Sequence, residues 1–278
     1  MAEAGTHDPR SGWRWDPTLY RGSAEHYLTG RLPYPAAIAD VLRDVLGLDG
    51  TGGYLDVGCG PGSVTTILAP LFEHATGIDA DADMIRVAAD AATRQGITGI
   101  HWRCLRAEEL PAGLGVQRLV TFAQSFHWFD RPLVARVVRG MLEQDGALVH
   151  VQATTHQGIE GSTTPRDEIA GLVTRYLGTT RRAGQGSLPD GTPGDEAAIF
   201  RDVGFTGPER IEVRRGESVE RTEDQIVASV FSLSSSAPHL FGDSLPAFER
   251  DLRALLRAAS PDGVFVERAR GVALDVWR

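Results

Sequence analysis

The stretch DVGCGPGS at residues 56–63 has the residue types and spacing of a ligand-binding turn. A strand-like apolar segment precedes it and a helical pattern follows it, so its glycines would let the backbone turn sharply and approach a ligand without a Cβ clash. The N-terminus of the following helix would present unpaired N–H groups to a polar or negatively charged group. We therefore predict a small-molecule site at this turn.

The spacing within the turn indicates which ligand it suits. Dinucleotide-binding turns space their glycines G-x-G-x-x-G, whereas Gly58, Gly60 and Gly62 are one residue tighter. Asp56 would repel a pyrophosphate but suits an ammonium group, directly or through water. Asp79 ends the next predicted strand, where an acidic side chain takes two ribose hydroxyls. S-adenosylmethionine has a ribose and an amino-acid end but no phosphate, so the turn favours this cofactor over a dinucleotide-dependent oxidoreductase.

A second group of reactive and aromatic side chains lies in QSFHWFD at residues 124–130. His127 could act as a general base, because a histidine pKa suits neutral pH, or it could be a hydrogen-bonded structural residue. Trp128 could wall an apolar substrate or belong to the core. His156 follows the fifth predicted strand and could also face the cleft. The segment is therefore the predicted reaction centre.

Tyr20 and Tyr27 are seven residues apart and would share one face of a helix. That face could line a substrate cavity or simply pack a lid. Arg166, Arg181 and Arg182 could bind an acidic substrate through bidentate contacts, but a solvated role is the preferred interpretation for each.

Composition excludes several classes of function. The formal net charge is −9, from 28 basic and 37 acidic residues, which disfavours a nucleic acid as the main substrate. The chain contains no lysine, so Schiff-base chemistry is excluded. Its two cysteines, Cys59 and Cys104, are too few for a disulfide framework or a structural zinc site. No metal cluster, membrane-spanning run or signal peptide is visible, so we expect a cytoplasmic protein.

The elements that must position these residues alternate between strand and helix patterns in the first half, as in a doubly wound parallel sheet. The predicted strands are residues 54–57, 75–79, 100–103, 118–123 and 147–153, and the helices are 63–72, 82–95 and 132–142. Ligands in such sheets bind at the carboxyl ends of the strands, which is where 56–63, Asp79 and 124–128 fall.

The second half of the chain no longer shows the regular alternation of strand and helix patterns. We predict a helix at 166–177, a mobile loop at 179–194, a short helix at 195–203, a strand at 210–214, a largely helical stretch at 222–259 interrupted near 234–242, and a strand at 271–277. This pattern suits an α/β fold with a seven-stranded, mostly parallel sheet and a helical lid. The last strand is expected to insert antiparallel. The expected division is a cap at 1–35, a cofactor-binding core at 36–160, a helical lid and substrate region at 161–262 that includes a late sheet strand near 210–214, and a final sheet strand at 263–278.

Four motifs carry a resemblance over residues 20–153: YLDVGCGPGSVT, GIDADADMI, RAEELP and VTFAQSFHWFD. With them the chain resembles the class I S-adenosylmethionine-dependent methyltransferases, in particular the small-molecule group related to ubiquinone and menaquinone biosynthesis enzymes. The resemblance implies that Asp56, Gly58 and Gly60 hold the methionine end and that Asp79 holds the ribose.

The same resemblance assigns the adenine and methyl ends of the cofactor. Ala80 and Met84 would flank the adenine, and the segment 106–108 would close over its edge. Many relatives have Asp where this chain has Arg106, so Glu108 or the backbone of Ala107 would replace that contact. Gln124 would lie beside the transferable methyl group.

These observations predict a methyltransferase acting on an O or N atom of a small organic molecule in biosynthetic or secondary metabolism. One alternative is a carboxyl O-methyltransferase of the aconitate type, which would need a basic pocket and would depend on Arg31 or Arg166. Another is a non-catalytic S-adenosylmethionine-binding module. The expected partner is a small-molecule substrate, with neither nucleic acid nor membrane, and the chain could form a homodimer.

Overall fold

The computed structural model describes residues 16–183, 186–188, 194–214 and 218–278. Its centre is a seven-stranded sheet in the order β3-β2-β1-β4-β5-β11-β8. The strands are β1 (Gly53–Val57), β2 (His74–Asp79), β3 (Ile100–Cys104), β4 (Gln117–Ala123), β5 (Leu142–Gln152), β8 (Glu209–Val213) and β11 (Val272–Trp277). Strand β11 runs antiparallel to both neighbours, β5 and β8. The predicted seven-stranded, mostly parallel sheet with an antiparallel last strand is therefore confirmed.

Alternate residues of the central strands face opposite sides of the sheet and meet different helices. Tyr54 of β1 belongs to a cluster with helices α2 (Ala37–Leu46) and α3 (Thr65–Leu68). Its neighbour Leu55 belongs to a cluster with α5 (Arg131–Met141) and α7 (Glu196–Asp202). This period of two explains why the strands read as continuous apolar runs: both faces of a doubly wound sheet are buried.

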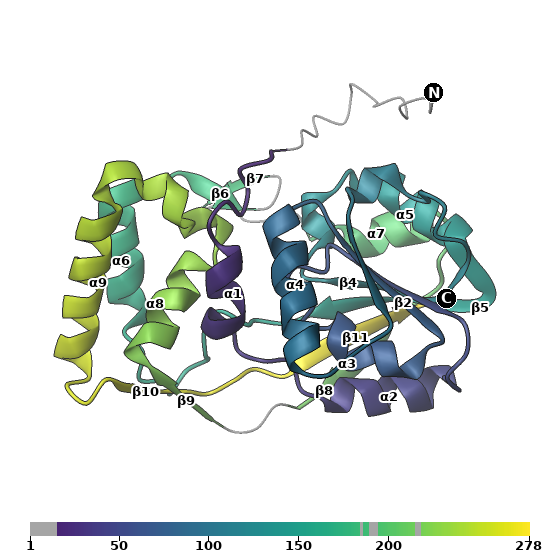
Figure 1. Cartoon of the computed structure of the whole chain (residues 1–278), viewed down its shortest axis with the longest axis horizontal. Coiled ribbons are helices and arrows are strands. Elements are labelled where there is room, and N and C mark those ends of the chain that lie inside the picture. The colour runs from purple at the N-terminus through teal and green to yellow at the C-terminus, as the bar shows by residue number, and fades with distance from the viewer. Residues whose placement is uncertain (1–15, 184–185, 189–193, 215–217) are drawn as a thin grey trace.

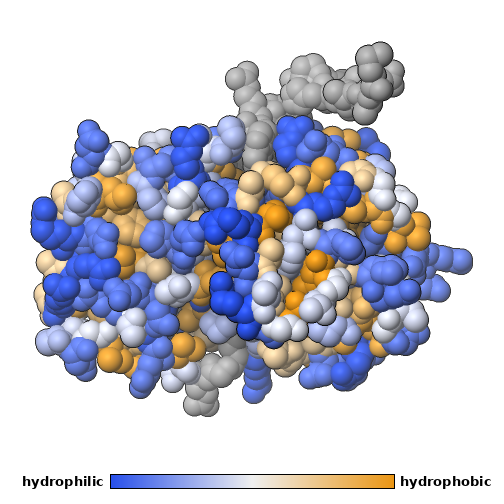
Figure 2. Space-filling view, viewed as in Figure 1, coloured by the Kyte–Doolittle hydropathy of each residue, from blue (hydrophilic) through white to orange (hydrophobic). Residues whose placement is uncertain are grey.

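A helical unit stands beside the sheet (Figure 1). It comprises α6 (Arg166–Leu177), α8 (Glu223–Phe231) and α9 (Leu245–Ala259), with its own apolar core, and the antiparallel pair β9 (Val219–Thr222) and β10 (Val264–Glu267). On the face shown in Figure 2, hydrophilic residues cover most of this unit. Helix α9 is accordingly amphipathic, with Phe248, Leu252 and Leu256 buried.

Helix α1 (Ala24–Gly30) connects the two parts: it packs against α8 and also contacts α4 (Ala82–Arg94) of the sheet unit. The contact with α8 is closest at Gly30, where a Cβ would lie 2.4 Å from the backbone carbon of Ala228. The N-terminal cap was expected to extend from residue 1, but residues 1–15 lie outside the described part.

The predicted boundaries differ from the structure at several places. Strand β5 begins at Leu142, earlier than the expected 147, because α5 ends at Met141. The segment 179–194, expected as a loop, contains the antiparallel pair β6 (Arg181–Ala183) and β7 (Gly186–Leu188), and 184–185 and 189–193 lie outside the described residues. Helix α7 belongs to the sheet unit, although it falls within the stretch 161–262 assigned to the lid, whereas β8 is the late sheet strand expected near 210–214. Helix α2 and the pair β9–β10 were not predicted.

No helix among the described residues is long and apolar enough to cross a membrane.

Candidate active site

The glycine turn connects β1 to α3 and places two glycines differently. Gly58 has a φ of 68°, and a Cβ there would lie 2.6 Å from the Cβ of Ser125, so only glycine lets the two loops approach this closely. Gly60 has a φ of 53°, and a Cβ there would have no atom within 4 Å. Gly60 therefore presents bare backbone to open space, which is the cradle predicted for a ligand.

Asp79 fixes this cradle from the end of β2. One carboxylate oxygen accepts the N–H of Gly60 at 2.9 Å, and the other accepts the N–H of Asp81 at 2.9 Å. Asp81 in turn caps helix α4 by accepting the N–H groups of Asp83 and Met84. Burial raises the pKa of Asp79 to about 6. A carboxylate at this depth gains from any further hydrogen-bond donor.

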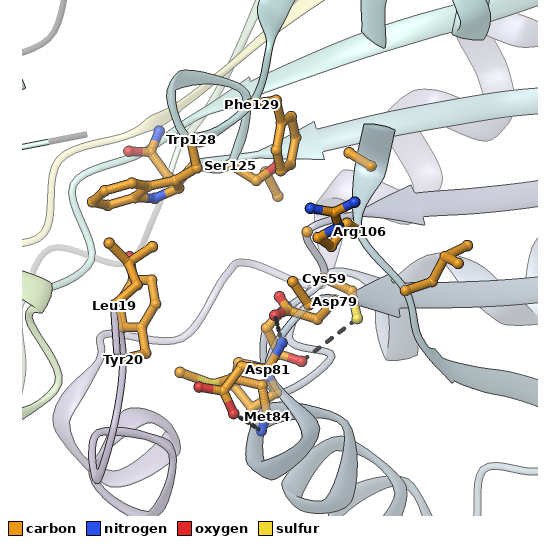
Figure 3. Close-up of a pocket in the computed structure, with 18 of the residues that line it drawn as sticks. Leu19, Tyr20, Cys59, Asp79, Asp81, Met84, Arg106, Ser125, Trp128 and Phe129 are labelled. Atoms are coloured by element: carbon orange, nitrogen blue, oxygen red, sulfur yellow. Dashed lines mark hydrogen bonds between the residues drawn. The ribbon is translucent and has the colours of Figure 1, made fainter. Parts of the chain in front are cut away.

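A first cavity of about 940 Å³ opens in front of the turn. Figure 3 shows Tyr20 and Trp128 on one side of it and Asp79 and Arg106 on the other. The predicted cofactor residues that line it are Gly58, Gly60, Asp79, Ala80, Met84, Ala107, Glu108 and Gln124. They come from four loops at the carboxyl ends of β1, β2, β3 and β4, the edge at which doubly wound sheets bind ligands.

Asp56 lies behind the cavity and not on its wall, unlike the other predicted cofactor residues. Its side chain is fully buried, and its two oxygens accept the hydroxyls of Thr65 at 2.6 Å and Thr121 at 2.7 Å. Burial raises the pKa of Asp56 to about 6. Asp56 was expected to meet a ligand ammonium directly or through water; in the structure its carboxylate ties β1 to α3 and β4 beneath the turn.

The segment 106–108 forms part of the wall of the first cavity. Glu108 lines the cavity while one of its oxygens accepts the N–H of Asp130 at 3.0 Å, and burial raises its pKa. The backbone N–H of Arg106 donates to Glu109 at 2.9 Å, which orients the loop. Arg106, the residue that departs from the family pattern, is also part of the wall.

Gln124 is one of two non-glycine residues with a positive φ in the described chain, at 57°. Its side chain donates from Nε2 to the carbonyl of Val151 at 3.3 Å, so β5 holds the strained residue in place. Backbone strain of this kind is retained mostly at functional sites. The positive φ of Gln124 turns the chain directly after β4. As a result, Gln124 lines both cavities of the site.

A second cavity of about 1290 Å³ adjoins the first and shares Tyr20, Tyr27, Gln124 and Trp128 with it. Tyr20 and Trp128 meet edge to face at 5.7 Å between ring centroids. The predicted substrate residues Tyr20, Tyr27 and Trp128 thus stand where the two cavities meet. His156 lines the second cavity only.

The predicted catalytic residue, His127, also lines the second cavity and not the first. It lies in the 3-10 helix Phe126–Trp128, and its ring is 4.9 Å from that of Trp128. Burial, with a smaller effect of Arg131, lowers the pKa of His127 to about 4. Burial, with Arg31 and Arg166, lowers the pKa of His156 to about 3. Both rings are therefore neutral at physiological pH, and the same lowering of the pKa makes each ring a weaker base than a solvent-exposed histidine.

The arginines require a correction. Arg166, Arg181 and Arg182 were preferred as solvated residues, but all three line the second cavity, together with Arg31. Arg31 follows Tyr27 by one helical turn, and its guanidinium lies 4.6 Å from the centre of that ring. That spacing is a sequence signal for a shared face. Arg166 begins α6, and Arg181 and Arg182 are neighbours in β6, so only the folded chain brings these two elements to Arg31.

The apolar residues near the end of the first half of the predicted helical stretch, 222–259, lie in different places. Phe231 and Phe241 are buried in the core of the helical unit, and Leu240 is exposed. Leu233 lines the second cavity, next to Ser234–Ser236, which the sequence did not single out. Among the described residues, no group of acidic, histidine and cysteine side chains is arranged to hold a metal ion.

Residues 55–146 match the methyltransferase domain family. The chain is similar to the uncharacterized methyltransferase YcgJ of Bacillus subtilis (strain 168), with 30% identity over 98 residues that span 35% of this chain and 39% of that protein. The match thus spans about two fifths of the relative's length.

Two solved structures share the fold. One concerns the conversion of a disulfide bond into a thioacetal group during echinomycin biosynthesis; it is 18% identical, has a TM-score of 0.51, and the match covers 94% of this chain and 90% of that one. The other is the [4+2]-cyclase SpnF, which is 17% identical with a TM-score of 0.50, over 87% of this chain and 80% of that one. At these identities the likeness concerns the fold alone.

Proposed function

We propose that this chain, whose core is a class I S-adenosylmethionine-dependent methyltransferase domain, moves a methyl group from that cofactor to an O or N atom of a small organic molecule. The observation that carries the proposal is the pair of adjoining cavities. One contains the glycine cradle and Asp79, the other contains His127 and His156, and they share Gln124, Trp128, Tyr20 and Tyr27. A transfer between two bound molecules needs this arrangement, because donor and acceptor must meet in line.

The residues of the first cavity fit the cofactor. Gly60 offers an unobstructed backbone at one end, the partly buried carboxylate of Asp79 can accept ribose hydroxyls, and Ala80, Met84 and Ala107 line the cavity with apolar side chains that suit a flat ring. Glu108 or the backbone of Ala107 would take the adenine edge, and Gln124 would lie beside the methyl group. When bound, the cofactor supplies a methyl group already activated by its sulfonium.

The protein's own contribution would be alignment, exclusion of water and, where the acceptor carries a proton, its removal. His127 is proposed as the base, because its neutral ring stands in the second cavity beside Trp128. A hydroxyl acceptor needs such a base, whereas a neutral amine or a carboxylate does not. Tyr20, Tyr27, Trp128 and His156 would contact the substrate.

A biosynthetic or secondary-metabolic role is part of the proposal, and the fold neighbour from echinomycin biosynthesis supports it only through the shared fold. The subgroup related to ubiquinone and menaquinone biosynthesis stays a prediction, as do the homodimer and the cytoplasmic location. The strongest rival within methyl transfer is the carboxyl O-methyltransferase, because the second cavity is basic as that alternative requires.

The test is calorimetric titration of the full chain with S-adenosylmethionine and S-adenosylhomocysteine, followed by incubation with methyl-labelled cofactor and a metabolite extract. We expect both to bind, with the demethylated product at least as tight, and label to appear in a small molecule. Absence of binding to either compound would overturn the proposal. Binding without any labelled product would favour the non-catalytic binding module instead.

A further inference from the structure

The lining of the second cavity is strongly basic, in a chain whose formal net charge is −9. Arg31, Arg166, Arg181 and Arg182 all contribute to the wall, whereas none of its described lining residues is Asp or Glu. A cavity lined by charges of one sign concentrates ligands of the opposite sign. The local charge thus opposes that of the molecule as a whole.

Two of these arginines have an acidic partner, and the other two have none in the described part of the chain. Arg166 and the buried Arg221 share the single carboxylate of Glu267, and Arg182 lies 2.6 Å from Asp16. Among the described residues, no carboxylate lies within ion-pair distance of Arg31 or Arg181. Four arginines line this cavity, and among the described residues only Glu267, which Arg166 shares with Arg221, and Asp16 pair with them, which leaves an excess of positive charge.

Some of the guanidinium N–H groups also have no acceptor. The Nε of Arg31, the Nε of Arg181 and one terminal nitrogen of Arg182 are buried without a hydrogen-bond partner in the described structure. Burying a donor without an acceptor costs free energy, and such groups are normally paired in native proteins. A ligand with several acceptor oxygens would supply what these donors lack.

Contacts within the protein already fix the position of the Arg31 side chain. It donates to the carbonyl of Ser232 at 2.8 Å and to the hydroxyl of Thr155 at 3.3 Å, and it stacks over Tyr27. These contacts fix the guanidinium between the helical unit and the segment after β5. Because the side chain is already ordered, little conformational entropy remains to be lost when an anion binds.

Besides the arginines and several neutral polar residues, the wall contains apolar and aromatic side chains. Tyr20, Tyr27, Trp128, Ile169, Val173 and Leu233 line the same cavity. A ligand that consisted only of a small inorganic anion would leave this surface without a partner. The combination suits a molecule with an apolar or aromatic body and an anionic group at one end.

We propose that the second cavity takes an organic acid as the methyl-accepting substrate, with its oxyanion bound by Arg31 and Arg181. The shared chemistry is an oxyanion, which a carboxylate, a phosphate monoester or a sulfate could provide. This assignment rests on the proposed function, since it identifies the substrate class of the same site. Arg166 and Arg182, each paired with a carboxylate, shape the field around the bound group.

The test uses the full chain saturated with S-adenosylhomocysteine and titrated with matched probes: benzoate, phenyl phosphate and phenyl sulfate against neutral benzamide. We expect at least one anion to bind about tenfold or more tightly than benzamide. Arg31→Gln and Arg181→Gln should each weaken that anion about 10- to 100-fold, the usual effect of losing a hydrogen bond to a charged group. Which of the three anions binds best identifies the source of the oxyanion.

Arg250→Gln is the matched control, because it removes the same charge from a solvent-exposed site on α9. Its anion affinity should equal that of the unsubstituted chain. Arg31→Gln also removes contacts to Ser232 and Thr155, so the variants are compared by thermal unfolding, and Arg181→Gln carries the test if Arg31→Gln fails to fold. Equal binding of anions and benzamide, no binding of any probe, or no effect of Arg181→Gln would overturn the inference.

The two proposals fail in different ways. If S-adenosylhomocysteine binds while the anions show no preference, only the organic-acid substrate is lost. If the cofactor product does not bind at all, the proposed methyl transfer is lost, whatever the anions do.

Discussion

At the scale of single residues, Asp79 shows how burial gives one carboxylate two functions. It accepts two backbone N–H groups that shape the glycine turn and the start of α4, and it still lines the first cavity. Its pKa of about 6 lies well above the usual range for Asp because burial penalises the charge. Ribose hydroxyls would donate to the ionised form, so cofactor binding and ionisation of Asp79 should be coupled.

We therefore predict that affinity for S-adenosylmethionine falls as pH falls through 6. Protonated Asp79 is a poorer acceptor, so the affinity at pH 5 should be about tenfold lower than at pH 7.5. Asp79→Asn should weaken binding at pH 7.5 by about 1.5–3 kcal/mol and flatten the profile. Calorimetric titration at both pH values checks this. If the affinity of Asp79→Asn depends on pH as that of the unsubstituted chain does, the group that ionises near pH 6 is not Asp79.

His127 gives the second prediction at this scale. His127→Ala should lower kcat by about 10²–10⁴ if the ring removes a proton, and cofactor affinity should be retained because the ring lies outside the first cavity. Since its pKa is about 4, the ring is in its basic form throughout pH 5–8, and the rate should show no step near pH 6.5. His74→Ala, at an exposed site, is the control. An unchanged kcat would make His127 a structural residue.

At the scale of elements, α1 is the connection on which the site depends. It carries Tyr27 to both cavities, precedes Arg31, and packs against α8 at Gly30. The carbonyl of Gly30 also accepts a hydrogen bond from Arg221 at 2.6 Å. A shift of α1 would therefore move the walls of both cavities together.

Gly30→Ala tests this contact. The added Cβ would meet the backbone of Ala228 at 2.4 Å, so α1 must move, and we expect the free energy of unfolding to fall by about 1–3 kcal/mol. Gly171→Ala is the matched helical control, because nothing lies within 4 Å of the added Cβ. Alanine loses less backbone conformational entropy on folding than glycine, so this variant should be more stable by about 0.5–1 kcal/mol. Urea denaturation measures both. Equal effects would mean that the α1–α8 contact can relax.

A buried group of ion pairs joins the strands β9 and β10 to each other and to helix α6. Glu267 of β10 is fully buried and binds Arg221 of β9 at 2.8 Å as well as Arg166 of α6. Burial alone would raise its pKa, but the two arginines together hold the pKa of Glu267 below its usual range. Its stabilising contribution is therefore present above the unfolded pKa of about 4.5 and is lost as pH falls through the lower folded value.

Glu267→Gln should accordingly cost about 3–5 kcal/mol of unfolding free energy, because it leaves two arginines without their shared charge. Glu209→Gln breaks an exposed pair with Arg278 and should cost about 1 kcal/mol or less. The comparison is made by urea denaturation at pH 7. If the two variants lose similar amounts, solvent screens the Glu267 network more than its burial indicates.

At the scale of the whole molecule, the first cavity is walled by α1 and the preceding segment on one side and by the sheet unit on the other. A ligand there binds both parts of the chain at once. We predict that S-adenosylhomocysteine at about one hundred times its dissociation constant adds about 2.7 kcal/mol to the free energy of unfolding. Thermal unfolding should shift upward by several degrees, and less for Asp79→Asn. An unshifted midpoint would contradict binding to the folded chain.

Much of the fold could be predicted because its signals are local. The apolar runs of β1, β2 and β4, the helical period of α6 and the Gly-rich turn are set by neighbouring residues. Helix α6 was predicted with its observed bounds, Arg166–Leu177. The pair β9–β10 was missed because a short strand is stabilised by its partner, and that partner lies more than forty residues away.

The sequence by itself determined the cofactor turn: Gly58 and Gly60 permit a sharp, left-handed turn of the backbone, and Asp79 ends its strand at the spacing of a ribose ligand, all within one local β-α-β unit. Only the tertiary structure decided which charges face which cavity. It buried Asp56 between Thr65 and Thr121, and it gathered Arg31, Arg166, Arg181 and Arg182 around one cavity from distant segments. Side-chain burial and charge pairing depend on elements far apart in the chain, so the spacing of residues cannot encode them.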